Sequence, residues 1–397
     1  MASIDPSPAS RAPASTAPSG AQIHGFCSPG FEAVGEAFAA NFGRGEIGAS
    51  CAVTLEGELV VDLWGGHRDL ARRLPWQRDT LVNLWSTTKM LTALCMLMLD
   101  DRAALSVDAP VARVWPEFAA RGKEGVLVRH ILGHTAGLPV FDEPVDDLAI
   151  FDWEGCCARL AAQAPRWAPG EGSGYHAETQ GWLLGEILRR VDGRSLGRFF
   201  REEVALPLEL DLHVGLCEED LGRVADMATS HAEPNRPADP ALRSAAARSS
   251  ARSASLVNTI AWRSAELPAS NAHGHARSLA RVMAALANGG RVAGRQLLSP
   301  AAIERAFEVQ ADGIDRITGR HFRLGMGYGL NCPQTPLGTN DRTLWWAGWG
   351  GSMCVVDVQN RLSVAYAMNR MLAAGDLRAP SVIFAAHACR KKLGGGP

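Results

Sequence analysis

The chain has 397 residues, of which 47% are hydrophobic, and a formal net charge of -2 at pH 7. This length and composition permit a large hydrophobic core and exclude a fibrous or wholly disordered protein. The near-neutral charge creates no long-range field that would attract nucleic acid or an anionic membrane, so we expect a small-molecule partner, no nucleic acid and no membrane.

The first 28 residues are expected to form a disordered tail. Residues 1–21 are rich in Ala, Ser and Pro and lack the apolar core of a secretory signal. The nine cysteines of the chain are odd in number and show no C-x-x-C spacing, which indicates free thiols in a reducing compartment. Together these observations predict a cytoplasmic protein.

Apolar patterns predict secondary structure on both sides of a long, irregular middle region. A helix over 31–42 and a hairpin over 49–64, with its turn at Glu56-Gly57, begin the ordered chain. The region 104–275 is mostly helical or irregular, and its Ala/Arg/Ser/Pro-rich part, 233–255, predicts a mobile loop. The other expected elements are helices over 276–288, 300–308 and 380–392 and a hairpin with strands over 354–358 and 362–368.

Strands near both chain ends, with helices between them, predict an α+β fold in which an antiparallel sheet from both ends is flanked by helices. We therefore expect an α/β domain made of residues 29–103 and 276–397. A mostly helical domain, residues 104–275, is inserted between its two parts.

Ser86-Thr87-Thr88-Lys89 is the first candidate for chemistry. One helical turn carries the lysine onto the face of the serine, so the amine can reach the hydroxyl. Residues 90–99 are apolar on every side, which predicts a buried helix and a Lys89 whose pKa is lowered by burial. The spacing also occurs by chance, and Ser86 could simply cap the helix.

A serine nucleophile needs a proton donor for the leaving group, and the chain has only three tyrosines. Tyr366 lies within an apolar strand, where packing is its expected role, whereas Tyr328 lies in a glycine-rich turn that could line a cleft. Tyr175 ends a loop just before a helix expected over 178–191, which lets its phenol point into a cleft.

Trp349-Gly350-Gly351-Ser352 is the candidate for oxyanion binding, since it directly precedes the strand that starts at Cys354. Paired glycines let a strand edge approach a ligand, so the backbone N–H of Ser352 could face the N–H of Ser86. The alternative is a bulge at the strand start with Trp349 as a core aromatic residue.

Two further patterns are interpreted as decoys. Gly193-Arg194-Ser195-Leu196-Gly197 matches G-x-S-x-G, but an amphipathic helix precedes it where a nucleophile elbow needs a buried strand. Ser195 is therefore expected to cap the next helix. The histidine pairs form weak ligand sets, so we predict no metal and no cofactor; they are His273 with His275 and His130 with His134.

Several short motifs occur in an order and spacing that resemble a known family. Besides 86–89, they lie at 105–111, 115–118, 131–139, 169–175 and 270–274. From about Gly30 onward the chain resembles the serine β-lactamase and penicillin-recognising superfamily, and within it the class C-like esterases called family VIII carboxylesterases. This resemblance implies a β-lactamase/transpeptidase-like fold.

The resemblance also implies roles for individual residues. Ser86 would be the acylated nucleophile, Lys89 its hydrogen-bonded partner, and Tyr175 the proton shuttle. The backbone N–H groups of Ser86 and Ser352 would form the oxyanion hole. Whether Lys89 or Tyr175 is the main base stays open.

The chain departs from the β-lactamase pattern at two points. Tyr175-His176-Ala177 replaces Tyr-x-Asn, and Trp349-Gly350-Gly351 replaces Lys-Thr-Gly, so the cation that would pair with a substrate carboxylate is missing. Because an unpaired buried carboxylate is costly, the pocket should prefer uncharged esters. We expect Trp349, Gly350, Gly351, His176 and Trp85 to form it, although a solvent-facing position for His176 is an equal alternative.

The predicted function is hydrolysis of uncharged carboxylic esters with short acyl chains through an acyl-Ser86 intermediate. The alternatives are a β-lactamase or D-Ala-type amidase or peptidase, an acyltransferase that uses the same acyl-enzyme, and a non-catalytic binding relative. The intact Ser86, Lys89 and Tyr175 argue against the last. The sequence leaves the natural ester and the oligomeric state open.

Overall fold

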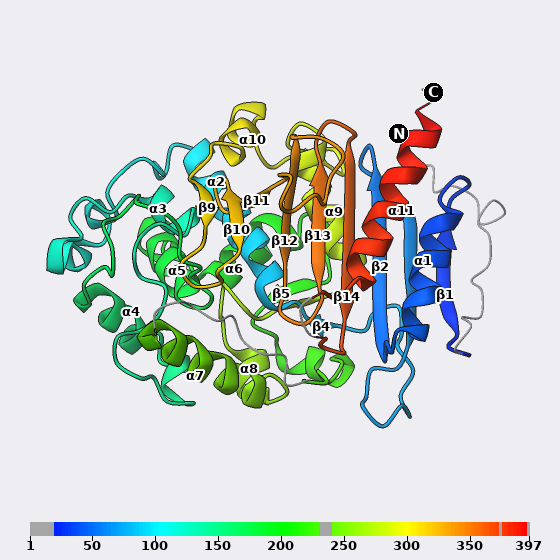
Figure 1. Cartoon of the computed structure of the whole chain (residues 1–397), viewed down its shortest axis with the longest axis horizontal. Coiled ribbons are helices and arrows are strands. Elements are labelled where there is room, and N and C mark those ends of the chain that lie inside the picture. Colours follow the sequence, from blue (N-terminus) through cyan, green and yellow to red (C-terminus); the bar gives the residue numbers. More distant parts are fainter. Residues whose placement is uncertain (1–19, 230–239, 373–374, 395–397) are drawn as a thin grey trace.

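The large sheet of the computed structural model joins strands from both ends of the described chain, which comprises residues 20–229, 240–372 and 375–394 (Figure 1). The junction is the antiparallel pair of β2 (Gly48–Leu55) and β14 (Leu362–Met368), both buried over nearly their whole length. All neighbouring strands are antiparallel. The order is β1 (Ile23–Cys27), β3 (Glu58–Gly66), β2, β14, β13 (Met353–Asp357), β12 (Thr343–Ala347), β11 (Gly329–Leu330), β10 (His321–Leu324) and β9 (Ala311–Ile314).

Helices cover both faces of this sheet (Figure 1). On one face, α1 (Glu32–Gly43) packs against α11 (Arg378–Leu393), which also contacts β14. On the other face, α9 (Ala276–Ala287) contacts β2, β13 and β14 through a strongly one-sided apolar surface. This arrangement confirms the predicted α+β class with a sheet built from both chain ends.

The helical part beside the sheet is organised around α2 (Lys89–Asp101), which is buried from Lys89 to Leu99 as its uniformly apolar sequence predicts. It contacts α5 (Thr179–Asp192), α6 (Leu196–Phe200) and α10 (Pro300–Ala306). The other helices and the small sheets are α3 (Val128–Leu132), α4 (Trp153–Ala162), α7 (Pro240–Leu256), α8 (Ile260–Ser264), β4 (Val82–Asn83) with β6 (Ala272–Gly274) and β5 (Leu212–Val214), and β7 (Arg291–Val292) with β8 (Arg295–Gln296).

Two sequence expectations about irregular segments are wrong. Strand β1 lies inside the segment 1–28 that is expected to be disordered; it pairs with β3 and buries Ile23. Residues 1–19 of that segment lie outside the described residues. Helix α7 occupies most of the expected loop 233–255, whose first residues also lie outside the described part. The helix is only weakly amphipathic, so its apolar residues do not recur with the period of about 3.6 residues that would predict a helix. Pro240 at its start is compatible with a first helical turn.

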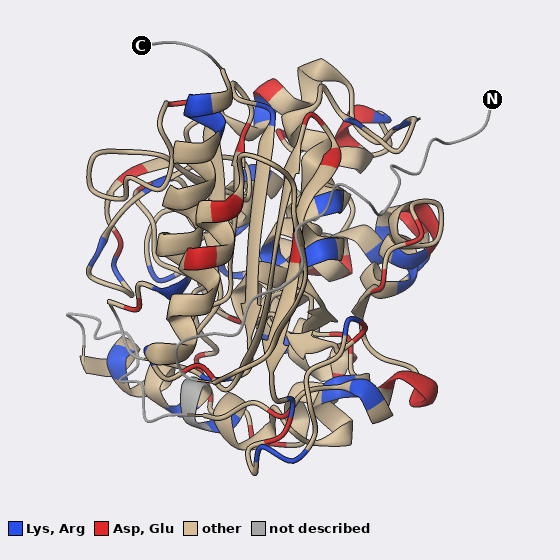
Figure 2. Cartoon of the chain, turned by 90° about the vertical axis from the view of Figure 1, so that its right-hand side faces the viewer, with Lys and Arg blue, Asp and Glu red and all other residues tan. Residues whose placement is uncertain are grey.

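Charges are mixed on the side of the molecule that faces the viewer in Figure 2, where basic and acidic segments alternate over the surface. Within the described ranges, none of the helices combines the length and apolarity needed to cross a bilayer. The division into two domains stays a prediction.

Candidate active site

Ser86 lies at the junction between strand β4 and helix α2, on a short 3-10 turn (Trp85–Thr88). The residue before it, Trp85, has φ of 48°, a left-handed conformation that non-glycine residues rarely adopt. The Thr88 hydroxyl stabilises this turn, because it donates to the Trp85 carbonyl at 2.5 Å and accepts from the Ala272 N–H at 2.9 Å. The turn leaves Ser86 partly exposed among buried neighbours.

Lys89 is 1% exposed, and its Nζ lies 3.3 Å from Ser86 Oγ. Nζ also donates to the carbonyls of Ala177 at 2.7 Å and Ala269 at 2.9 Å. Burial lowers the pKa of Lys89 to about 7, against the opposing effect of the Glu178 carboxylate. With two hydrogens donated to carbonyls, a neutral Lys89 can direct its lone pair toward the serine hydroxyl.

Tyr175 completes the group, since its hydroxyl donates to Ser86 Oγ at 2.6 Å. Its ring also lies close to the lysine, with Nζ of Lys89 4.9 Å from the ring centroid. Burial raises the pKa of Tyr175 to about 12, although hydrogen bonds with Ser86 and Trp346 act in the opposite direction. At neutral pH the phenol is therefore protonated and suited to donate a proton.

His176 is fully buried and is absent from the wall of the cavity at Ser86, so both expected positions, in the pocket and in solvent, are wrong. Its Nε2 accepts from the Leu138 N–H at 3.0 Å, and its backbone N–H donates to His134 Nδ1 at 3.1 Å. The His134 ring in turn packs edge-on against Tyr175, at 5.1 Å between centroids. Burial lowers the pKa of His176 to about 3 and holds the pKa of His134 well below its usual value, so both rings are neutral. The pair positions the loop that ends in Tyr175.

Ser352 follows a tight turn between β12 and β13 that docks on the residues around Ser86. Its Oγ donates to the Leu84 carbonyl at 2.7 Å and lies 3.0 Å from the Thr87 Oγ1. The approach is close enough to require glycine at position 348, because a Cβ there would lie 2.4 Å from the Leu84 carbonyl oxygen. The turn thus brings Ser352 beside the short turn that carries Ser86.

A cavity of about 340 Å³ opens over Ser86. The rings of Trp85 and Trp349 meet edge-on in its wall, with centroids 5.1 Å apart. Its wall includes the predicted residues Trp85, Ser86, Tyr175, Trp349, Gly350, Gly351 and Ser352. Other lining residues could not be predicted from the sequence, among them the aromatic Phe322 and Trp346 and the charged Glu178, Arg320 and Asp376.

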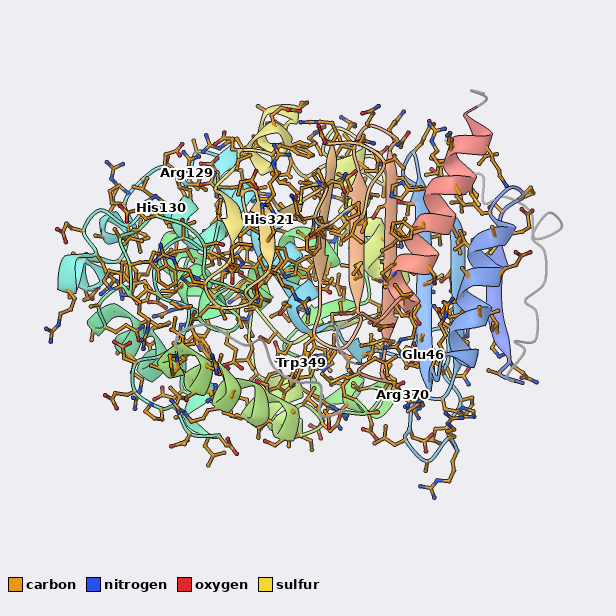
Figure 3. The ribbon with its side chains drawn as sticks, in the orientation of Figure 1. Glu46, Arg129, His130, His321, Trp349 and Arg370 are labelled. Atoms are coloured by element: carbon orange, nitrogen blue, oxygen red, sulfur yellow. The ribbon has the colours of Figure 1, made fainter. Side chains whose placement is uncertain are left out.

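A buried ionic network lies behind the 348–352 turn. Arg378, which is 0% exposed, forms an ion pair with Glu46 at 2.6 Å and another with Asp376 at 2.8 Å. Its guanidinium also donates to the Gly350 carbonyl at 3.1 Å, and Tyr366 donates to Glu46 at 2.6 Å. Figure 3 shows Trp349, Glu46 and Arg370 at the same end of the sheet. The network therefore positions the glycine turn of the cavity wall.

Ser195 and His130, which belong to the two expected decoys, have structural roles. Ser195 caps helix α6 by accepting from the Arg198 N–H at 3.3 Å, and its hydroxyl donates to Glu266 at 2.7 Å. His130 accepts from the Leu127 N–H at 3.2 Å at the start of α3, on the opposite side of the helical part from Trp349 in Figure 3. Tyr328 does not line a cleft, because it is fully buried and donates to the Met90 carbonyl at 3.3 Å.

One group among the described residues has the composition of a metal site: Asp211, His213 and Asp220. Arg223 lies between the two carboxylates and forms ion pairs with both, at 2.5 Å to Asp220. Both carboxylates are thereby bound to one guanidinium, and we assign the group as an ion-pair cluster.

Comparisons with known proteins identify the family of the chain. A family model described as Beta-lactamase matches residues 34–387. The chain is 34% identical over 366 residues to a protein named Esterase/beta-lactamase LipL from Mycobacterium tuberculosis, covering 89% of this chain and 84% of that protein. The solved structure of a family VIII carboxylesterase is 41% identical, with a TM-score of 0.86, and covers 92% of this chain and 99% of that chain. A penicillin-binding protein homologue from Caulobacter crescentus has the same identity and coverage, with a TM-score of 0.85.

Proposed function

Since the chain belongs to the Beta-lactamase family and is an esterase-type hydrolase of that superfamily, we propose that it cleaves uncharged carboxylic esters with short acyl chains through an acyl-Ser86 intermediate. One observation carries the proposal: the Tyr175 hydroxyl and Lys89 Nζ lie 2.6 Å and 3.3 Å from the same serine oxygen. These distances suit proton transfer to and from a nucleophile.

Acylation begins when Ser86 Oγ attacks the ester carbonyl and neutral Lys89 accepts the hydroxyl proton. The backbone N–H groups of Ser86 and Ser352 stabilise the oxyanion that develops on the carbonyl oxygen. Tyr175 then donates its proton to the departing alkoxide oxygen as the carbon–oxygen bond breaks, and it recovers a proton from Lys89. The products of this half-reaction are a free alcohol and an acyl-serine.

Deacylation uses the same groups in reverse. A water molecule occupies the place of the departed alcohol and loses a proton toward Tyr175 and Lys89 as it attacks the acyl-serine carbonyl. Ser86 leaves as an alkoxide and regains its proton, so a carboxylic acid is released and the starting protonation state is restored.

The residues that line the cavity favour a substrate with an uncharged acyl group. Ala177 offers no side-chain amide for an acylamido group, and Trp349-Gly350-Gly351 brings no cation to the nucleophile. Aromatic side chains, by contrast, lie around the serine, and apolar walls favour apolar ester groups.

Covalent trapping and substrate comparison test this proposal. A fluorophosphonate should phosphonylate the protein once, so that the mass rises by that of the reagent minus HF, and peptide mapping should place the adduct on Ser86. The turnover of 4-nitrophenyl butyrate should exceed that of a chromogenic cephalosporin by at least about tenfold in kcat/KM. A label on another residue would refute the assigned nucleophile. Faster cephalosporin turnover would instead favour β-lactamase activity, which the name of the Mycobacterium tuberculosis relative includes.

The pH profile gives a separate test of the lysine. Because Lys89 has a pKa of about 7 and must be neutral to accept the Ser86 proton, kcat/KM for a neutral ester should fall about tenfold per pH unit below pH 7. It should be constant between about pH 8 and 9, where Lys89 is neutral and the Tyr175 phenol is still protonated. Initial rates between pH 5.5 and 9, corrected for spontaneous hydrolysis, measure this, and a flat profile would contradict the role of Lys89.

A further inference from the structure

Among the described residues, three charged side chains line the cavity, and they differ in whether a partner neutralises them. Glu178 is paired with Arg252 at 2.7 Å, and it also accepts a hydrogen bond from Ser253. Asp376 is paired with Arg378 at 2.8 Å. The guanidinium of Arg320, in contrast, is exposed and forms no ion pair or hydrogen bond within the described residues. It is therefore the unmatched charge of the described cavity wall.

The loop that carries Arg320 is the connection between β9 and β10, and its conformation is fixed by local hydrogen bonds. Asp315, which is 0% exposed, accepts from the N–H groups of Ile317 at 3.0 Å and Thr318 at 2.8 Å. The Asp315 N–H also donates to the Arg320 carbonyl at 2.9 Å. Arg320 is thus presented by an ordered turn and lies at a defined place at the cavity mouth.

This turn is also tied to the loop that ends in Tyr175. The Arg316 N–H donates to the Ser173 carbonyl at 2.9 Å, and its guanidinium donates to the Glu171 carbonyl at 2.8 Å. Two residues after Arg320, Phe322 packs against the Tyr175 ring at 6.5 Å between centroids. The backbone of Arg320 is therefore held at a fixed place relative to Tyr175.

We propose that Arg320 forms a subsite for a carboxylate carried by the ester substrate at the end remote from the reacting carbonyl. A guanidinium binds a carboxylate through two parallel hydrogen bonds, and an exposed one loses little hydration when it does so. The inference rests on the proposed esterase function and changes one part of it: the group next to the reacting carbonyl stays uncharged, but the substrate carries a carboxylate at its remote end. A monoester of a dicarboxylic acid, or a hydroxy acid acylated on its hydroxyl with its carboxyl group free, is then the preferred kind of substrate. The ester carbonyl itself remains in the uncharged, aromatic part of the cavity.

Pairs of esters that differ only in the carboxylate test this subsite. For the acyl half, the pair is the 4-nitrophenyl monoester of glutaric acid and 4-nitrophenyl valerate; for the alcohol half, 4-carboxyphenyl butyrate and phenyl butyrate. The measured quantity is the ratio of kcat/KM for the charged ester to that for the neutral ester. Arg320→Gln should lower this ratio about five- to tenfold in one of the two pairs, which also identifies the half that carries the carboxylate.

Arg295→Gln is the matched control, because Arg295 is an exposed arginine of β8 outside the cavity wall. It should leave both ratios within twofold of wild type. Equal ratios in wild type and Arg320→Gln for both pairs would overturn the subsite. An equal fall with Arg295→Gln would also overturn it, because the effect would then come from the general charge of the protein.

A binding measurement separates failure of the subsite from failure of the esterase function. Monomethyl glutarate should quench the tryptophan fluorescence of Ser86→Ala protein, since tryptophans line the cavity, and adding Arg320→Gln should weaken its Kd about fivefold or more. If no ester is turned over but this Kd changes, the esterase proposal fails and the carboxylate site stands. If esters are turned over and the Kd does not change, the subsite fails alone.

Discussion

Ser86→Ala should lower kcat for 4-nitrophenyl butyrate by about 10⁴-fold or more, because no acyl-enzyme can form without the serine oxygen. Loss of a nucleophile in other serine hydrolases leaves only the residual rate that substrate binding and oxyanion stabilisation provide. Initial rates measured with protein purified free of host esterases, and a circular dichroism spectrum to confirm folding, give the result.

Ser195→Ala is the matched control for that experiment. Ser195 lies in the G-x-S-x-G sequence, but its hydroxyl caps helix α6 and donates to Glu266 at 2.7 Å. Its removal should lower the free energy of unfolding by about 1 kcal/mol and leave kcat within twofold of wild type. If Ser195→Ala abolished turnover and Ser86→Ala did not, Ser86 would not be the nucleophile and the active site would have to lie elsewhere.

Arg378→Met should lower the free energy of unfolding by about 3–5 kcal/mol, because it leaves the fully buried Glu46 carboxylate without its cation. It also removes the donor to the Gly350 carbonyl, so the turn of the cavity wall loses support. Urea denaturation followed by fluorescence measures the change in stability. Arg295→Met, which replaces an exposed arginine, should change it by less than about 0.5 kcal/mol.

The pH dependence of that loss provides an internal check. Burial already raises the pKa of Glu46 to about 7, above its ordinary value of 4.5, and removing Arg378 would raise it further. The folded variant then binds a proton that the unfolded chain has lost, so its stability falls as pH rises above about 4.5. The loss relative to wild type should therefore be larger at pH 8 than at pH 5.5. The double variant Glu46→Met/Arg378→Met should recover part of it, because no buried charge remains unpaired; a double variant as unstable as Arg378→Met would contradict this explanation.

Features that depend on neighbouring residues could be predicted from the sequence. The three-residue step from Ser86 to Lys89 determines their side-by-side placement on one helical turn, and the apolar run after Lys89 indicates its burial. Ser195 is predicted as a cap for the same reason, since the helix before it excludes a nucleophile elbow. The sequence position of Tyr175 does not by itself predict its role. Its place just before a helix allows the phenol to point into a cleft, and only the motif resemblance identifies it as the proton shuttle.

Features that depend on distant partners could not be predicted. Nothing beside Arg378 in the sequence reveals that Glu46 meets it in the core, because this contact forms only when α11 packs beside α1. His176 is expected in the pocket or in solvent, but it is buried. Its backbone N–H donates to His134, which lies on a different segment, and this contact could not be predicted from the sequence. Strand β1 is not predicted, because it is a five-residue edge strand that pairs with one neighbour only. Its sequence is too short to show a clear alternation of apolar and polar residues. The missing cation at Trp349 suggests an uncharged cavity, yet Arg320 reaches the same cavity from a different hairpin.

The pairing of β2 with β14 has a consequence for biosynthesis. At a translation rate of about 5–20 residues per second, β2 leaves the ribosome roughly 15–60 seconds before its partner strand does. During that interval an apolar strand with an unpaired edge is exposed, and such contacts between distant parts of a chain form slowly. Ser352 and Arg378 also come from the late part of the chain, so the wall of the cavity over Ser86 and the ion pair that supports it can form only after the sheet closes.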